Sequence, residues 1–437
     1  MKRPLKITLL LSALFMLSGC SLNAGVDTLL TPPKLSTQQE HIYKALTDYA
    51  GTNISLKYPK SGDYLSAFII ADVDGDSESE AVVFYRKNSL NNTDDSSLRM
   101  NILDQNGSGW HSVCDYEAGG NEIEQVKITK LGNNDRINII VGYSLINQSE
   151  KVVSIYDYSD GKLNTTFENN YYSVFDTADI NGDGTLELFT ALGQSTSRQA
   201  SAAVYYLGED GNYLRSTVKL SESFTGYSNM KYGKLPDGST AVYLDADTGN
   251  GMIATEVFTV DSRNNLIELF APDIKKEETL RPSAYTCGDV DGDGETEIPV
   301  PVVCPGYEGK TDDSRVYFSK WYVLDDEDKL EEKYLSYQSI TDGYTFIIPD
   351  EWRDKVTVDV DSSGLRFCRY DKQTGTGNEI FRVVTVSDSS KHQAFKKSGF
   401  ELLHSKGDKM FFIKINAEDE LVSSPAEIML KFKFEDK

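Results

Sequence analysis

The chain has 437 residues, of which 39% are hydrophobic and 26% charged, and its 68 acidic against 44 basic residues give a formal net charge of -24. This composition is that of a globular protein and excludes a disordered or collagen-like chain, and the length favours two or three domains. Because binding to phosphate backbones needs a basic face and no Lys/Arg cluster follows the first six residues, we expect no nucleic-acid partner.

The first twenty residues are typical of an export signal. Three basic side chains within residues 2–6 precede the apolar run Ile7–Leu17, which is too short to span about 30 Å of hydrocarbon. The run ends in Leu-Ser-Gly-Cys at residues 17–20, which resembles the bacterial lipobox. That resemblance implies a signal peptide over residues 1–19, lipidation of Cys20, and a lipid anchor in the cell membrane on its extracytoplasmic face. The alternative is ordinary secretion with Cys20 unmodified.

A tether and a helix follow the predicted anchor. Residues 20–35 are polar, contain Pro32 and Pro33, and show no apolar period, so we expect a flexible connection. Ser36 with Gln39 three residues later is typical of a capping box, and Gly51 is a helix stop. The pattern predicts one short helix between Ser36 and Gly51.

From about residue 52 to 340 the pattern is that of an all-β region. Short runs rich in Val, Ile and Tyr are separated by Asn-Gly, Asp-Gly or Ser-Gly turns, which is the pattern of successive hairpins. Clear examples are Ala81–Tyr85, Met100–Leu103, Val152–Tyr156, Ala203–Tyr206 and Val316–Tyr322.

An acidic nine-residue loop occurs three times in this region, starting at Asp72, Asp179 and Asp289. Calcium prefers six to eight oxygen ligands, and polar side chains at positions 1, 3, 5 and 9 with a carbonyl from position 7 would supply them. Position 6 should turn sharply; it is glycine in two loops but Ser77 in the first, so that loop departs from the pattern. The candidate ligands are Asp72, Asp74, Asp76 and Glu80; Asp179, Asn181, Asp183, Thr185 through its carbonyl, and Glu187; and Asp289, Asp291, Asp293, Glu295 and Glu297.

Two further copies of the repeat, Lys127–Val141 and Tyr232–Tyr243, keep the strand-loop-strand pattern without the carboxylates. Together the copies make about five units of roughly 48 to 60 residues, each long enough for four short strands, as in a β-propeller blade. The acidic segments resemble FG-GAP repeats of integrin α-subunit propellers and the related VCBS-type repeats of bacterial secreted proteins. This resemblance implies a propeller with structural Ca²⁺ in each intact loop, and a role in adhesion or ligand binding. The alternative is that the loops are acidic turns without metal.

The sequence also suggests two long-range contacts. Closure of the ring would pair the strand Ser66–Val73 with the hairpin Val316–Tyr337 of the last unit. Cys287 and Cys304 flank the third acidic loop, so they could form a disulfide across its two strands. For Cys114 and Cys368 we expect unpaired buried thiols.

After about residue 340 the pattern changes to that of a small α+β domain covering residues 341–437. Strands are predicted from Tyr344, Val356, Leu365, Phe381 and Met410, and helices from Ser389 and from the cap Ser424. The phrase Gly343–Trp352 resembles the start of small domains of the Mog1/PsbP type, and no functional residue follows from it.

No catalytic motif accompanies these features. The four histidines are scattered, and there is no H-E-x-x-H, G-x-S-x-G, P-loop or dinucleotide fingerprint. The function expected is therefore that of a surface-anchored bacterial lipoprotein with a calcium-stabilised β-propeller, which binds a protein or glycan ligand or acts as a scaffold. An enzyme acting on polysaccharide through carboxylates on the propeller face is the alternative, and a structural partner of an envelope complex is a third possibility.

Overall fold

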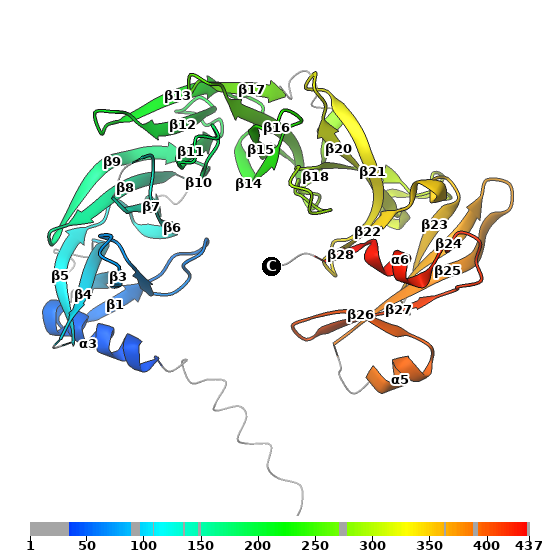
Figure 1. Cartoon of the computed structure of the whole chain (residues 1–437), viewed down its shortest axis with the longest axis horizontal. Helices are drawn as coiled ribbons and strands as arrows, with labels where there is room; N and C mark the ends of the chain where they lie inside the picture. Colours follow the sequence, from blue (N-terminus) through cyan, green and yellow to red (C-terminus); the bar gives the residue numbers. More distant parts are fainter. Residues whose placement is uncertain are drawn as a thin grey trace, which may run out of the picture.

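The computed structural model describes residues 35–88, 97–107, 109–133, 136–146, 150–270, 278–361, 364–387 and 392–434. Within them the fold is mainly β, built from antiparallel sheets with a few short helices (Figure 1). The predicted signal peptide, Cys20 and nearly all of the tether lie outside these residues. No helix in the described part of the chain is long and apolar enough to cross a bilayer.

The first described helix, α3 (Thr37–Ala50), begins and ends as predicted. The Ser36 hydroxyl accepts from the backbone N–H of Gln39, while the Gln39 side chain accepts from the backbone N–H of Ser36. Gly51 ends the helix at a positive φ of 88°, a conformation that glycine adopts without steric cost.

Five antiparallel sheets follow in chain order, and we number them 1 to 5. Sheet 1 contains β1 (Ile54–Lys57) and β2 (Phe68–Ala71), which both pair with β3 (Glu80–Lys87), then β4 (Arg99–Asn106) and β5 (Gly109–Glu117); sheet 2 contains β6 (Glu122–Thr129), β7 (Asn138–Ser144), β8 (Lys151–Ser159) and β9 (Lys162–Tyr172). Sheet 3 contains β10 (Val174–Ala178), β11 (Glu187–Leu192), β12 (Ser201–Leu207) and β13 (Tyr213–Lys219).

The last two of these sheets carry additional strands. Sheet 4 contains β14 (Gly226–Lys234), β15 (Thr240–Gly249), β16 (Met252–Val260) and β17 (Leu266–Phe270), with β18 (Arg281–Pro282) also on β16. Sheet 5 contains β19 (Ile298–Val303), β20 (Tyr317–Leu324), β21 (Leu330–Ser339), β22 (Tyr344–Ile348) and β28 (Phe432–Phe434). The two carboxylate-free copies of the repeat form the hairpins β6–β7 and β14–β15, as the sequence predicted.

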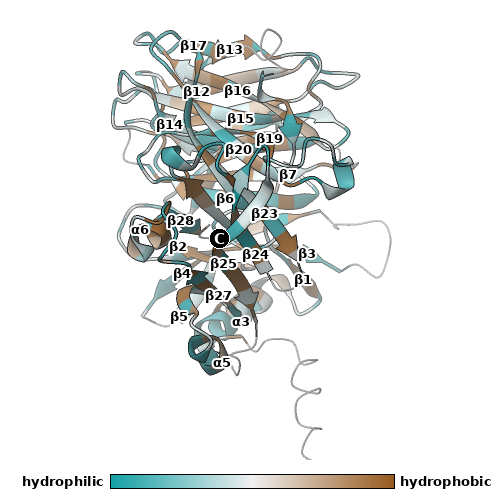
Figure 2. Cartoon of the chain, turned by 90° about the vertical axis from the view of Figure 1, so that its right-hand side faces the viewer, coloured by the Kyte–Doolittle hydropathy of each residue, from teal (hydrophilic) through white to brown (hydrophobic). Residues whose placement is uncertain are grey.

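Each sheet packs face to face on the next, and the stack follows an arc (Figure 1). The strands can be apolar on both faces because successive side chains point to opposite sides. In β3, Val82 and Phe84 pack toward sheet 2, whereas Ala81 and Val83 pack toward α3. Figure 2 shows that the hydrophobic stretches follow the strands and that the projecting loops are mostly hydrophilic.

The arc does not close into a ring, so the expected pairing of Ser66–Val73 with the last hairpin is wrong. Within the described residues β2 pairs only with β3. The outer face of sheet 1 is instead covered by α3, through the fully buried side chains of Ile42 and Leu46. An apolar sheet face needs one cover, and here a helix supplies it.

The other end of the stack is covered by the C-terminal residues. A sheet in the order β23 (Val356–Asp361), β24 (Gly364–Asp371), β25 (Gly375–Val386), β27 (Lys409–Ile415) and β26 (Glu401–Lys406) shares a core with sheet 5. Phe346 of β22 contacts Phe367 and Phe381 edge to face within that core. Two short helices, α5 (His392–Lys397) and α6 (Pro425–Leu430), complete this part, and Ser424 caps α6 as predicted.

The strand predicted from Tyr344 exists as β22, but it extends sheet 5, and β28 pairs with its other edge. Residues on both sides of the predicted boundary at 340/341 therefore share one sheet. Cys287 and Cys304 are buried free thiols. They belong to two different cores, one between sheets 4 and 5 and the other beyond sheet 5, so the disulfide interpretation is wrong. Cys114 and Cys368 are free thiols as predicted, Cys368 buried and Cys114 partly buried.

Candidate cation sites

The three acidic segments occupy equivalent places, each directly before the strand that follows it in its sheet. Loop 1 (residues 72–80) joins β2 to β3, loop 2 (179–187) joins β10 to β11, and loop 3 (289–297) precedes β19. In loop 3 the preceding strand is reduced to a single bridge between Gly288 and Glu297. The sequence repeat therefore corresponds to a connection that recurs near the start of sheets 1, 3 and 5.

The loops share one backbone conformation. In each, Oδ2 of the first aspartate accepts from the backbone N–H of the sixth residue at 3.0 Å. The sixth residues, Ser77, Gly184 and Gly294, have positive φ values of 76°, 86° and 92°. Loop 1 therefore keeps the turn despite its serine, at a steric cost of about 1–2 kcal/mol for a residue with a Cβ.

The ninth residue has a structural role that the sequence only partly indicated. Glu80, Glu187 and Glu297 are 1%, 2% and 0% exposed. Their Oε2 atoms accept from the backbone N–H of the second loop residue at 2.8–2.9 Å. In the carboxylate-free copy of sheet 2, Asn138 Oδ1 accepts from the equivalent N–H, of Leu131, at 3.0 Å. A polar side chain at position 9 is therefore needed for the turn. In the three glutamates, Oε1 is the oxygen that remains to contact a cation.

Loop 1 gathers carboxylates without a protein cation. Oxygens of Asp72, Asp74 and Glu80 lie within 4.8 Å of one another, and in the described residues no ion pair reaches a carboxylate of this loop. Burial raises the pKa of Glu80 to about 7; the hydrogen bond from Val73 opposes this rise, and the charges of neighbouring aspartates add to it. Burial, assisted by the charge of Asp76, also raises the pKa of Asp74, against a backbone hydrogen bond from Asp76. A bound cation would relieve both the repulsion between these carboxylates and the cost of burying them.

Loop 2 is less acidic and more internally bonded. The Asn181 amide donates to Asp183 Oδ2 and to Asn264 Oδ1 in the β16–β17 turn, both at 3.0 Å. Asp179 Oδ1 is buried and has no hydrogen-bond partner among the described residues. Burial raises the pKa of Glu187 to about 7, with a backbone hydrogen bond from Ile180 acting against it.

Within loop 2, Thr185 contributes two hydrogen-bond donors. Its backbone N–H and its hydroxyl both donate to Asp183 Oδ1, at 2.8 and 2.7 Å. Burial raises the pKa of Asp183, but these hydrogen bonds outweigh burial and the net shift is downward. In the described residues, loop 2 does not bring three carboxylates within 4.8 Å of one another, as loops 1 and 3 do. A cation in loop 2 would therefore depend on amide and carbonyl oxygens as well.

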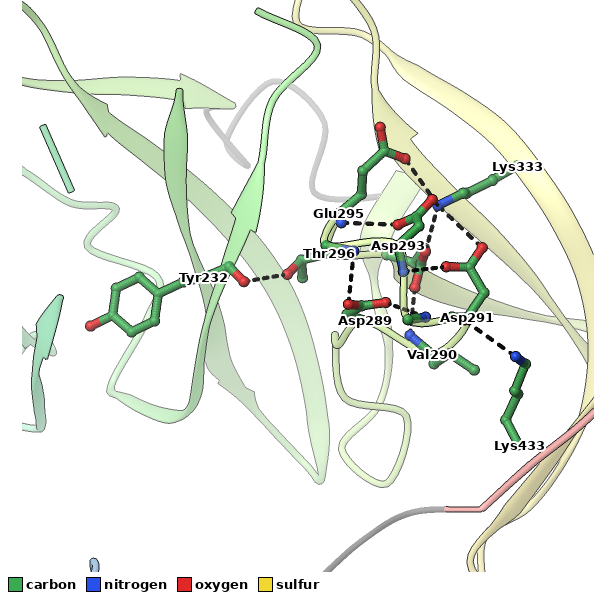
Figure 3. A network of polar contacts seen from close by, with 12 residues as sticks. Tyr232, Asp289, Val290, Asp291, Asp293, Glu295, Thr296, Lys333 and Lys433 are labelled. Carbon is green, nitrogen blue, oxygen red and sulfur yellow. Dashed lines mark hydrogen bonds and ion pairs between the residues drawn. The ribbon is translucent and has the colours of Figure 1, made fainter. Parts of the chain in front are cut away.

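Loop 3 contains a cation of the protein itself (Figure 3). Nζ of Lys333 in β21 lies 3.3 Å from Asp291 Oδ2, 2.9 Å from Glu295 Oε2 and 2.8 Å from Glu297 Oε1, and it also pairs with Asp293. The sequence reasoning missed Lys333, which lies 36 residues beyond Glu297 and in no motif. Burial lowers the pKa of Lys333, but the hydrogen bonds to Asp293 and Glu297 outweigh burial and raise it.

The loops also lie at the seams between sheets. The backbone N–H of Lys234 in sheet 4 donates to Gly294 O of loop 3 at 2.8 Å, and the Thr296 hydroxyl donates to Tyr232 O at 3.1 Å. At the seam of sheets 2 and 3, Gly132 N donates to Leu186 O of loop 2 at 3.0 Å. A loop that keeps its shape therefore also fixes the neighbouring sheet.

No family model matches the sequence, and no curated protein matches it. Among solved structures, a Lactobacillus plantarum protein has 11% identity and a TM-score of 0.30 over 74% of this chain and 92% of its own. A protein of unknown function from Dyadobacter fermentans has 10% identity and a TM-score of 0.29, over 84% and 98%. Sqt1 of Chaetomium thermophilum has 11% identity and a TM-score of 0.30, over 82% and 96%. Structural similarity at these TM-scores does not indicate a function.

Proposed function

We propose that this chain is a surface-anchored bacterial lipoprotein whose calcium-braced array of β-sheets serves as a binding or scaffolding module. The observation that carries the calcium part is loop 1, where Asp72, Asp74 and Glu80 converge without a protein cation. Calcium is a hard cation that selects carboxylate and carbonyl oxygens, which the acidic side chains and the backbone of this loop supply. Loop 2, with the unpartnered Oδ1 of Asp179, is the second site in the proposal.

The role of the ion in this proposal is structural. Loops 1 and 2 precede inner strands of their sheets and loop 3 precedes the edge strand β19, and loops 2 and 3 bond to the neighbouring sheet through the backbone. A cation that neutralises the crowded carboxylates stabilises the turn and, through it, the seam. Loops of this kind in an extracellular protein bind calcium at about 10⁻⁴ to 10⁻³ M, which is sufficient outside a cell.

Calcium titration followed by thermal melting tests this assignment. After chelation and dialysis, addition of 10 mM CaCl₂ should stabilise the protein by about 1.4–2.7 kcal/mol for each site, by mass action at 10 to 100 times Kd. Asp74→Asn and Asp179→Asn should each remove part of the rise in Tm. The matched control is Asp210→Asn, an exposed aspartate in the β12–β13 turn whose carboxylate accepts from the backbone N–H and the amide of Asn212. Equal shifts in all three variants and in the unchanged protein would contradict ion binding in these loops.

The same proposal treats the five sheets as blades of a propeller-like array that remains open. The support is that each sheet begins with the same connection and packs on the next, while α3 and the C-terminal residues cover the two ends. An array whose ends are covered is stable without closure, as in repeat proteins with capping units. Small-angle scattering in calcium should give the profile of an arc with a gap; the profile of a closed ring would contradict the proposal.

The binding role rests on the sequence resemblance and on the predicted anchor at Cys20, and its ligand is a protein or a glycan. Immobilised protein should retain specific components from a cell-wall extract or a glycan array in calcium, and should release them on chelation. Retention of envelope proteins alone would favour the scaffolding role. Turnover of a polysaccharide without loss on chelation would instead favour the enzymatic alternative.

A further inference from the structure

Loop 3 differs from loops 1 and 2 in that its carboxylates already surround a positive charge. Asp291, Asp293, Glu295 and Glu297 all contact the ammonium of Lys333, whose side chain is 19% exposed. Oxygens of three of these residues and of Asp289 also form the group that lies within 4.8 Å and could hold a metal ion. The ammonium therefore occupies the place that the sequence assigned to calcium.

We propose that Lys333 is the resident cation of loop 3 and excludes calcium from it, so that loop 3 keeps its shape without a metal. The proposal rests on the proposed function, because it takes calcium binding in loops 1 and 2 as the reference. It divides the three similar loops into two that depend on calcium and one that does not.

A β-bulge explains how Lys333 reaches the loop. In both sheet 1 and sheet 5, the residue after the ninth loop residue is linked by the strand register, across the next two strands, to a bulge. The residue without a partner in the register is Val113 in sheet 1 and Lys333 in sheet 5. A bulge turns its extra residue away from the regular alternation, and a long basic side chain there extends to the loop, whereas valine does not. The paired residues along this path are Ala81, Leu103 and Ser112 in sheet 1, and Ile298, Tyr322 and Glu332 in sheet 5.

Competition favours the lysine for two physical reasons. The ammonium is attached to the same chain, so its effective concentration at the loop is in the millimolar range or above, comparable with the weak calcium affinity of extracellular loops. In addition, calcium entering loop 3 would have to displace an ammonium held by four carboxylates. A second lysine supports the same loop, because Nζ of Lys433 donates to the backbone oxygen of Asp291 at 3.2 Å.

The number of calcium ions bound per chain, measured by isothermal titration calorimetry and by equilibrium dialysis with radioactive calcium, tests the proposal. Lys333→Met should bind one ion more than the unchanged protein. Lys320→Met is the matched control: Lys320 is in the adjacent strand and pairs with Glu332 at 2.8 Å, outside the loop, so its loss should leave the number of ions unchanged. An unchanged number in Lys333→Met overturns the proposal.

A second variant keeps the test decisive if Lys333→Met fails to fold. Asp293→Ala removes a loop 3 carboxylate, and it should leave the number of ions unchanged if Lys333 excludes calcium; loss of one ion overturns the proposal. The number of bound ions also distinguishes calcium binding in loops 1 and 2 from exclusion of calcium by Lys333. If the unchanged protein binds no ion and Lys333→Met binds one, loops 1 and 2 are not calcium sites. Exclusion of calcium from loop 3 by Lys333 would still be supported. Three ions in both proteins would support the calcium proposal and overturn this inference.

Discussion

The guanidinium of Arg281 donates to Oδ1 of Asp245 at 2.5 Å, and both side chains are fully buried. The remaining acceptor capacity of Asp245 is used by the Thr255 hydroxyl, the Asn229 amide and the backbone N–H of Cys287. This buried pair ties the segment that leads into loop 3 to the middle strands of sheet 4, so the position of loop 3 depends on it.

We expect Arg281→Met to lower the free energy of unfolding by about 3–5 kcal/mol, because it leaves the buried carboxylate of Asp245 without its countercharge. Urea denaturation at pH 7 measures this. Arg215→Met, a change of an exposed arginine in β13, is the control and should stay within about 0.5 kcal/mol. A loss below 1 kcal/mol in Arg281→Met would show that the pair does not hold this segment.

A second prediction concerns the seam between sheets 1 and 2 and its dependence on pH. Glu124 of β6 pairs with Lys60 at 2.6 Å and with Lys151 at 3.1 Å. Burial raises the pKa of Glu124, but the two lysines outweigh burial and hold it below its usual range. A carboxyl with a depressed folded-state pKa stabilises above its unfolded pKa of about 4.3 and loses that contribution as pH falls through the folded value.

Glu124→Gln should therefore be less stable than the unchanged protein at pH 7, by about 0.5–1 kcal/mol after allowance for solvent screening of the exposed lysines. The difference should shrink as the pH falls below about 4.3 and disappear only below the depressed folded-state pKa, where the carboxyl is protonated in both states. Urea melts from pH 3 to 8 measure this, with Glu209→Gln, an exposed residue of the β12–β13 turn, as the control. A difference that is constant over this range would assign the effect to packing instead of charge.

The helix that covers sheet 1 gives a third prediction. Leu46→Ala removes a fully buried side chain between α3 and sheet 1, so we expect a loss of about 2–5 kcal/mol in the free energy of unfolding. Tyr49→Ala, at a position on the same helix that is 57% exposed, should have little effect. If both variants were equally stable, α3 would not be the cover that replaces ring closure.

The predicted anchor can be tested independently of the fold. Cys20→Ser should prevent incorporation of a labelled fatty acid and move the protein from the membrane fraction to the soluble fraction, because the acyl chains supply the membrane affinity in this prediction. Cys114→Ser, a change of another free cysteine, should leave both results unchanged. Membrane retention without labelled lipid in the Cys20 variant would contradict the lipobox interpretation.

Local chemistry made much of the fold predictable. The capping box at Ser36, the cap at Ser424 and the glycine-containing turns act over a few residues, so the sequence contains all that they need. The strand-loop-strand copies were predictable for the same reason, including those without carboxylates. The turn at Ser77 was harder, because the residue type disfavours a conformation that the surrounding hydrogen bonds impose.

The sequence by itself determined where the sheets begin and which loops are acidic, because alternation of apolar residues and the spacing of Asp and Gly are properties of neighbouring residues. The tertiary structure decided whether the sheets close into a ring and which charge enters each loop. α3 rather than another sheet covers sheet 1, and Lys333 arrives in loop 3 from a bulge on another strand. Burial and charge compensation act between surfaces that meet only when the chain is folded, so residues distant in sequence settle these questions.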